Sequence, residues 1–324
     1  MNRICETLGI KYPVVQSAMA WICNAEMIAA VSNAGGMGVL ASNNGQASVT
    51  SDPIETAERM RDQIRKVRSL TDKPFALNYL SVPEGEEEND VFGRPMLEMA
   101  YEEGVKHILM CNCINRNTIR ELKDHGITVI FRDISPTPET AKMAEDAGAD
   151  VIIATGYDEG GFIPAHAIGT MSIVPVIVDA VSVPVLAAGG IADKRGVKAA
   201  FALGAEGVYV GTRFICSTEC PAAQVVKEDI VKHSSQDLLF FKSGYTYLRS
   251  TPHKLAQKMK EMTDAGVSHA EINSQISPGG ILRVGMLEGR MDEGVVSVGN
   301  GIDLIHDIKS CEEIIHDLID GVDF

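Results

Sequence analysis

Basic residues are scarce in this sequence, and the charge balance excludes two classes of partner. The 324 residues include 29 Lys and Arg against 44 Asp and Glu, a formal net charge of −15. Nucleic acids and anionic membrane surfaces are bound by clustered Lys and Arg side chains. We therefore expect neither nucleic acid nor membrane as a partner, and a small molecule as the substrate.

Long apolar runs and paired cysteines are missing as well. No apolar run reaches membrane-spanning length, and the stretch MNRICETLGIKYP lacks the apolar core of a signal peptide. The seven cysteines are odd in number and scattered, and Cys111-Asn-Cys113 lacks the CxxC spacing of a zinc site. We expect a cytoplasmic protein without a metal centre. The sequence sets no oligomeric state, and a homodimer is one option.

One sequence pattern repeats along the chain: an amphipathic helix, a small residue with glycine, then an apolar strand. Gly104, Gly126 and Gly148 are 22 residues apart, the length of one short helix and one strand, and each stands where a helix end favours a left-handed residue. Helices are expected to begin after Asn24 and Asp193, which are N-capping residue types. This repeating pattern predicts strands at 13–19, 37–42, 74–80, 107–113, 127–133, 151–156, 184–190 and 207–214.

Eight such repeats with continuous apolar strands favour a parallel sheet closed into a barrel. A doubly wound sheet is the rival, but GGMG at 35–38 ends a helix and enters a strand, the wrong order for a dinucleotide-binding turn. We therefore predict an α/β fold, a TIM (β/α)8 barrel over residues 1–214. A small, mainly helical lid subdomain is expected over 215–290, and residues 291–324 should return to the barrel and end in an amphipathic helix.

In such a barrel the ligand site lies at the carboxyl ends of the strands. These ends carry glycines and uncharged hydrogen-bonding groups, a set that suits a flat neutral heterocycle better than acid–base hydrolysis. The sharpest signal is the pair AAGGIAD (187–193) and YVGTRF (209–214), because glycine amides after strands seven and eight form a phosphate site in this fold. The simpler alternative is a pair of tight turns without a ligand.

Two further residues near the strand ends each have two interpretations. Trp21, the only tryptophan, would either line a pocket or cover the packing of the first long helix. Arg132, at the end of the fifth strand, would either form an ion pair in the neighbourhood of Asp133, which we favour, or bind an anionic group of a substrate.

Taken together, PVVQSAMAW, SNAGGMGVL, KPFALNYL, the EGG loop, PVLAAGGIAD and GVYVGTRF resemble the nitronate monooxygenase (2-nitropropane dioxygenase) family, which includes FMN-dependent enoyl-acyl-carrier-protein reductase II enzymes. The likeness covers nearly the whole chain in order. It implies a TIM barrel that holds FMN under a lid, and an oxidoreductase that acts on alkyl nitronates. The alternatives are an NAD(P)H-dependent reductase of an activated C=C bond such as a 2-enoyl thioester, with NADH or NADPH as co-substrate, an FMN-binding protein with neither activity, and a phosphate-binding barrel without flavin.

The resemblance also implies a set of cofactor-binding residues. They are Gln16, Ser17, Ala18 and Met19 beside the isoalloxazine ring, Asn78 at the ring or the ribityl phosphate, Gly160 and Gly161 where the loop backbone passes the cofactor, Ala188, Gly189, Gly190, Gly211 and Thr212 around the phosphate, and Gly299 and Asn300 in place of a Gly-Gln pair of relatives.

The catalytic position departs from the family pattern. The family loop typically reads GGH with the His assigned to catalysis, but here Phe162 occupies that position, and a phenyl ring cannot transfer a proton. Thr155 stands where reductase relatives often carry Glu. His166, Tyr157 and Tyr245 are candidate proton donors, although we favour a surface position for His166. Because a nitronate is already an anion, the sequence predicts oxidation of nitronates and poor use of neutral nitroalkanes.

Overall fold

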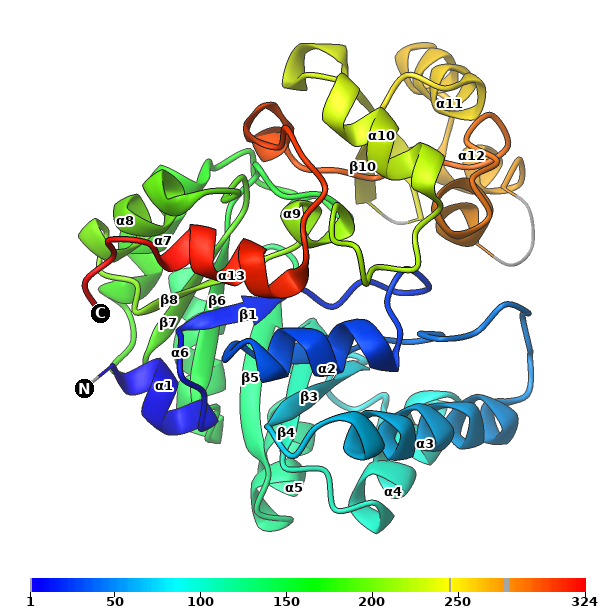
Figure 1. Ribbon diagram of the computed structural model, residues 1–324. Helices are drawn as coiled ribbons and strands as arrows, with labels where there is room; N and C mark the ends of the chain where they lie inside the picture. The colour runs from blue at the N-terminus through cyan, green and yellow to red at the C-terminus, as the bar shows by residue number, and fades with distance from the viewer. Residues whose placement is uncertain (1, 245, 277–279) are drawn as a thin grey trace.

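The computed structural model describes residues 2–244, 246–276 and 280–324, and its centre is a ring of eight parallel strands (Figure 1). The strands are β1 (Val14–Gln16), β2 (Gly38–Leu40), β3 (Phe75–Leu80), β4 (His107–Asn112), β5 (Thr128–Asp133), β6 (Val151–Thr155), β7 (Val185–Ala188) and β8 (Gly207–Val210). Each lies within a range that the sequence predicted. The TIM barrel is therefore confirmed.

The ring closes between β1 and β2. Hydrogen-bonded neighbours run in the order β1-β8-β7-β6-β5-β4-β3-β2, and Val15 forms a parallel bridge with Met37 just before β2. The amide of Gln16 donates to the carbonyl of Met37 at 2.9 Å. The amide of Val39 donates to Oε1 of Gln16 at 3.0 Å, so this side chain also holds the seam together.

Helices surround the ring and begin where capping residues satisfy their first amides. They are α2 (Ala25–Asn33), α3 (Pro53–Leu70), α4 (Gly93–Glu102), α5 (Arg116–Asp124), α6 (Pro138–Ala147), α7 (Thr170–Val178), α8 (Lys194–Ala202) and α13 (Cys311–Ile319). Asn24 accepts a hydrogen bond from the amide of Met27 at 2.9 Å, and Asp193 accepts one from Arg195 at 2.9 Å. None of the described helices has both the length and the apolar content needed to cross a membrane.

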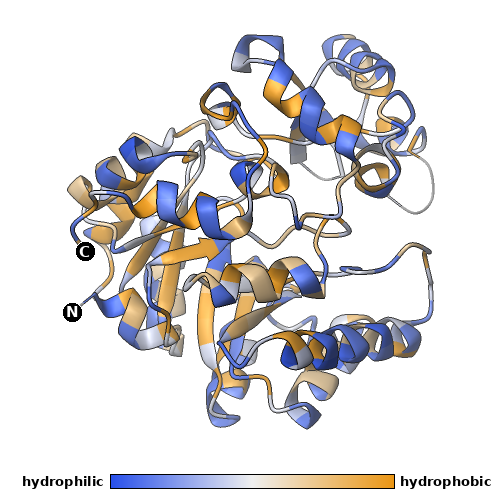
Figure 2. Cartoon of the chain, in the orientation of Figure 1, coloured by the Kyte–Doolittle hydropathy of each residue, from blue (hydrophilic) through white to orange (hydrophobic). Residues whose placement is uncertain are grey.

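Two apolar layers stabilise the barrel. One lies between the strands and the outer helices, and Figure 2 shows the apolar colour concentrated on the strands and on the helix faces turned toward them. The other fills the ring with side chains such as Val15, Leu109 and Ile153, and α1 (Arg3–Leu8) adds Ile4 and Leu8 to it. Because the interior is packed, a ligand can enter only at the mouth of the barrel.

The segment after β8 begins with α9 (Thr212–Ile215) above the barrel and then forms the lid in the upper right of Figure 1. The lid contains α10 (Gln224–Lys232), η2 (Ser235–Asp237), β9 (Leu239–Ser243), β10 (Thr246–Ser250), α11 (Lys254–Asp264), α12 (His269–Asn273) and η3 (Arg283–Leu287). The antiparallel hairpin β9–β10 was not predicted from the sequence, which indicated helices. It packs Phe241 and Leu248 against Met259 and Ile272 in a small separate core. The domain boundaries proposed above stay a prediction.

The C-terminal segment ends in an amphipathic helix, as expected, but this helix is shorter than the stretch GIDLIHDIKSCEEIIHDLIDGV that predicted it. The segment forms a short turn, η4 (Asn300–Leu304), and then α13, which Ser310 caps by accepting from the amide of Glu313 at 3.2 Å. The turn η4 begins beside the loop that follows β6, so this late segment contributes to the mouth of the barrel.

Candidate functional site

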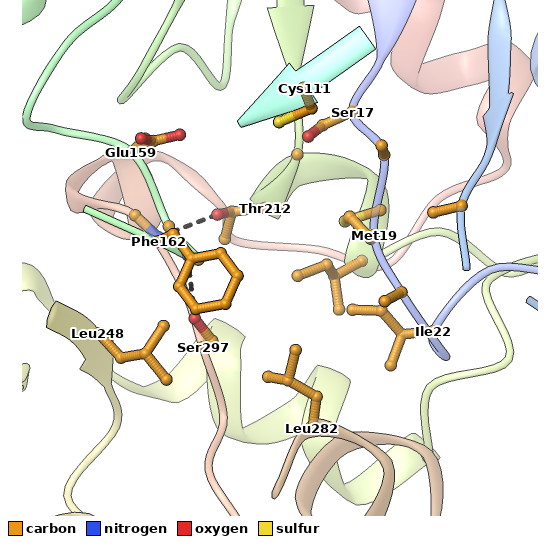
Figure 3. A pocket seen from close by; sticks show the side chains of 18 of the residues that line it. Ser17, Met19, Ile22, Cys111, Glu159, Phe162, Thr212, Leu248, Leu282 and Ser297 are labelled. Atoms are coloured by element: carbon orange, nitrogen blue, oxygen red, sulfur yellow. Dashed lines mark hydrogen bonds between the residues drawn. The ribbon is translucent and has the colours of Figure 1, made fainter. Parts of the chain in front are cut away.

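The carboxyl ends of the strands and the lid enclose a cavity of about 560 Å³ (Figure 3). Ligand sites typically have volumes of roughly 300–1,000 Å³. The predicted residues that line the cavity are Ser17, Ala18, Met19, Asn78, Gly160, Gly161, Phe162, Ala188, Gly189, Gly190, Gly211, Thr212 and Gly299. The structure therefore brings segments from six parts of the sequence around one space.

Four predicted residues lie outside the lining. Gln16 is fully buried, and Oε1 of its side-chain amide accepts the hydrogen bond from Val39 at the β1–β2 seam. Asn300 donates from Nδ2 to Oδ1 of Asp158 at 3.2 Å, so it fixes the loop after β6. His166 is exposed, in agreement with the favoured interpretation, and Tyr157 packs its ring 5.8 Å from that of Phe240 in the lid. Tyr245 lies outside the described residues.

One corner of the cavity is formed by the tips of β7 and β8. Gly189 and Gly190 have φ of 108° and 70°, the left-handed region that favours glycine. A Cβ at Gly189 would lie 2.6 Å from Oγ1 of Thr170, so the tip has no room for a side chain. Within the described part of the chain, the amides of Gly190, Gly211 and Thr212 donate no hydrogen bond to another residue. Three amides at one corner are thus available to an anion.

The loop between β6 and α7 forms a second wall and is fixed at several points. The carboxylate of Asp158 accepts from the amide of Thr170 at 2.9 Å, while its carbonyl accepts from the amide of Asn300 at 2.9 Å. The amide of Gly161 donates to Oγ of Ser297 at 3.0 Å, and this bond is drawn in Figure 3. A Cβ at Gly160 would lie 2.7 Å from the carbonyl carbon of Val298, so only glycine allows this close approach.

A buried ion pair joins that loop to the barrel. Nη2 of Arg132 contacts Oε2 of Glu159, and the two residues are only 8% and 9% exposed. The favoured interpretation of Arg132 as an ion pair is correct, but its partner is Glu159 rather than a neighbour of Asp133. Arg132 also donates to Oγ1 of Thr155 at 3.2 Å and to Sγ of Cys111 at 3.1 Å. Both members of the pair belong to the cavity lining.

Burial raises the pKa of Glu159 to about 7, against the opposing effect of the positive charges on Arg132 and Arg249. Oε1 of Glu159 is buried and has no hydrogen-bond partner among the described residues. Glu159 was not predicted from the sequence, because the EGG segment stands out for its glycines. The available signal was a carboxylate directly before a glycine pair at a strand-end loop.

The remaining wall is apolar. Phe162 is 39% exposed and projects its ring into the cavity, and Leu248 and Leu282 come from the lid beside it (Figure 3). Trp21 also lines the cavity while packing in the large outer core, so both interpretations of this residue hold. No group of three His, Cys, Asp or Glu side chains suited to a metal ion occurs within the described ranges.

Comparison with known protein families gives one match along almost the whole chain. Residues 2–321 match the family model described as nitronate monooxygenase. A curated relative named probable nitronate monooxygenase, from Staphylococcus saprophyticus, is 33% identical over 274 residues, which cover 73% of this chain and 74% of the relative.

A second curated relative, from Rhodococcus jostii, is named (3aS,4S,5R,7aS)-5-hydroxy-7a-methyl-1-oxo-octahydro-1H-indene-4-carboxyl-CoA dehydrogenase. It is 29% identical over 365 aligned residues, which cover 99% of this chain and 94% of the relative. Among solved structures, FabK from Thermotoga maritima is 33% identical with a TM-score of 0.84, covering 98% of this chain and 95% of that one. Nitroalkane oxidase from Streptomyces ansochromogenes has a TM-score of 0.79 at 24% identity over 97% of this chain and 96% of that one, which shows the same fold.

Proposed function

The chain belongs to the nitronate monooxygenase family, and from this premise we propose that it binds FMN in the cavity above the barrel and oxidises alkyl nitronates. Membership makes it a flavin-dependent oxidoreductase. The observation that supports FMN is the corner at the tips of β7 and β8, where three amides that donate to none of the described residues border a cavity of about 560 Å³. A monophosphate is the anion that this corner suits.

The residues at the corner fit the phosphate of FMN. The amides of Gly190, Gly211 and Thr212 would donate to phosphate oxygens. Oγ1 of Thr212 already accepts from the amide of Gly299 at 3.0 Å, so its hydroxyl hydrogen remains free to donate to the same group. Because a side chain at Gly189 would collide with Thr170, the tip keeps this shape only with glycine.

The rest of the cavity suits a flat ring and an apolar substrate. Nδ2 of Asn78 donates to the carbonyl of Leu109 at 2.9 Å, which fixes its orientation and leaves Oδ1 as an acceptor. Bound FMN would supply electron transfer between a substrate and an oxidant such as dioxygen. The chain would hold the substrate against that ring and exclude water with the apolar side chains of Phe162, Leu248 and Leu282.

A second candidate is the oxidation or reduction of a C–C bond next to a thioester carbonyl, with NADH or NADPH as the co-substrate in the reductive direction. It is favoured by the alignment with the Rhodococcus CoA-ester dehydrogenase over 99% of this chain and by the likeness to FabK at a TM-score of 0.84. The apolar lid wall would accept either an alkyl nitronate or an acyl chain.

Anaerobic stopped-flow absorbance of the FMN-loaded protein separates the candidates. Bleaching of the flavin by an alkyl nitronate alone supports the proposed function. Rapid bleaching by NADH or NADPH followed by reoxidation with a 2-enoyl thioester supports the second candidate. A reduced flavin that only dioxygen reoxidises indicates an FMN-binding protein with neither activity, and a protein that ignores FMN contradicts the proposal.

A further inference from the structure

Glu159 is a carboxylate on the wall of a cavity whose other walls are mostly apolar or made of backbone. Figure 3 shows it on the opposite side of the view from Met19 and Ile22, close to the loop that carries Phe162. One of its oxygens, Oε2, pairs with Arg132, while Oε1 is buried without a hydrogen-bond partner among the described residues. An unpartnered carboxylate oxygen costs free energy, so a residue kept in this state needs a reason.

We propose that Glu159 is the proton-transfer residue of this site, accepting the α-proton of a neutral substrate on its carboxylate, and that Arg132 is the positioning residue that holds it. The inference rests on the proposed oxidation of nitro compounds and adds neutral nitroalkanes to the substrates. The sequence predicted poor turnover of neutral nitroalkanes because Phe162 cannot transfer a proton. Glu159, in the same loop, has a side chain that can.

The other candidates are less well placed. His166 is exposed and Tyr157 is turned toward Phe240, and neither lines the cavity. Phe162 lines it but has no titratable group. Glu159 and Arg132 are the only Asp, Glu, Lys, Arg or His residues in the described lining. Arg132 cannot serve as the base, because a guanidinium does not give up its proton at ordinary pH.

The groups around Glu159 balance its charge without removing its reactivity. Arg132 approaches Glu159 from β5 and Arg249 approaches it from β10, while Cys111 of β4 and Tyr209 of β8 lie beside Arg132. Burial raises the pKa of Glu159 to about 7, and a base with a pKa near the working pH is the most effective. The guanidinium keeps the carboxylate in one orientation, which a free side chain in a cavity of this size would not have.

The step conserves atoms and charge. The α-C–H bond of the nitroalkane breaks, its proton forms an O–H bond on the carboxylate of Glu159, and the electron pair is delocalised into the nitro group to give the nitronate. The negative charge thereby moves from Glu159 to the substrate, while the positive charge of Arg132 stays in the same wall and stabilises the product anion. No oxidant takes part until the nitronate is oxidised as proposed above.

The test compares nitroethane with pre-formed ethyl nitronate in the wild type and in Glu159→Gln. We expect kcat/KM for nitroethane to fall by about 10²–10⁴-fold and that for the nitronate to change by less than about threefold. The matched control is Glu206→Gln, which removes the same carboxylate from an exposed pair with Arg3 and should leave both values unchanged. Equal losses with both substrates would overturn the proposal, because a structural role would affect both.

Two measurements without turnover complete the test. Proton NMR follows exchange of the α-hydrogens of nitroethane with deuterated water under anaerobic conditions, and infrared spectroscopy follows the protonated carboxyl band as the pH changes. We expect catalysed exchange, and a band that disappears near pH 7, in the wild type and neither in Glu159→Gln. A wild type that catalyses exchange but oxidises neither compound contradicts only the proposed function, while a wild type without exchange overturns the role of Glu159.

Glu159→Gln leaves a buried guanidinium without its counter-charge and can fail to fold. The double variant Arg132→Met/Glu159→Gln removes both charges and is measured in the same way. A folded double variant that still catalyses exchange at the wild-type rate would overturn the proposal.

Discussion

The guanidinium of Arg249, on the lid strand β10, donates a hydrogen bond of 2.6 Å to the main-chain carbonyl of Glu159, on the loop after β6. The same guanidinium donates to the carbonyl of Tyr157 at 3.0 Å. One buried side chain therefore ties the lid to the loop that carries the proposed proton acceptor. The position of Glu159 depends on the lid as well as on the barrel.

Replacing Arg249 by Met should loosen that loop. The change leaves two carbonyls with no donor from the lid, and each unsatisfied buried group costs about 1–3 kcal/mol. We expect a lower melting temperature and faster amide hydrogen exchange over residues 156–163. Hydrogen-exchange mass spectrometry checks this, with the half-exposed Arg290→Met as the control. Unchanged exchange in the loop would contradict the coupling.

The phosphate corner can be tested with Gly211→Ala. Gly211 has φ of −108°, which alanine adopts without strain, and its Cβ would come no closer than 3.4 Å to Ser17. The fold should remain intact while the methyl group crowds the amides beside it, so we expect FMN to bind at least about tenfold more weakly, about 1.4 kcal/mol. Quenching of flavin fluorescence on titration measures the affinity.

The control for that experiment is Gly126→Ala. Gly126 has φ of +69° and lies at the end of α5, away from the cavity. Its replacement should cost roughly 1 kcal/mol of stability because of strain and leave FMN affinity unchanged. Equal FMN affinity in Gly211→Ala and in the wild type would argue against a phosphate at this corner.

The rate with neutral nitroalkanes should depend on pH through Glu159. Its pKa is raised to about 7 by burial, and the ionised form is the base, so kcat/KM for nitroethane should rise with pH up to about 7 and level off above it. The nitronate needs no proton removal, so its kcat/KM should not show this rise with pH. Initial rates over a pH series with both substrates give the comparison, and parallel profiles would count against the assignment.

Position 162 offers a rescue experiment. Phe162 is 39% exposed and lines the cavity, so Phe162→His should change stability by no more than about 0.5 kcal/mol. An imidazole there can accept a proton, and we expect it to restore part of the nitroethane turnover lost in Glu159→Gln. Phe162→Leu in the same background should restore nothing. Rescue by both variants would show that removal of the ring, not proton transfer, is responsible.

Much of the barrel could be predicted from the sequence because parallel strands buried on both faces give continuous apolar runs. Gly104, Gly126 and Gly148 mark helix ends with φ of 62°, 69° and 112°, so each boundary was visible as a residue type. The hairpin β9–β10 was missed because FFKSGYTYLRS mixes aromatic and charged residues without a clear period. Its aromatic and β-branched content with a central glycine was the signal for strands.

The parts of the candidate site that are formed by the backbone at glycines could be predicted from the sequence. The parts that depend on contacts between side chains distant in the sequence could not. Glycines at the strand tips are visible in the sequence, and they line the cavity. Arg132 and Glu159 are 27 residues apart, and nothing local indicates that they meet. Gln16 was expected at the cofactor, and nothing in the sequence indicated that its side chain also hydrogen-bonds the main chain at the barrel seam.

A crystal structure of the protein with FMN tests the central claim most directly. We predict that the phosphate lies within hydrogen-bond distance of the amides of Gly190, Gly211 and Thr212, with the ring system extending toward Ser17 and Asn78. A phosphate bound elsewhere, or crystals that take up no FMN at saturating concentration, would contradict the account.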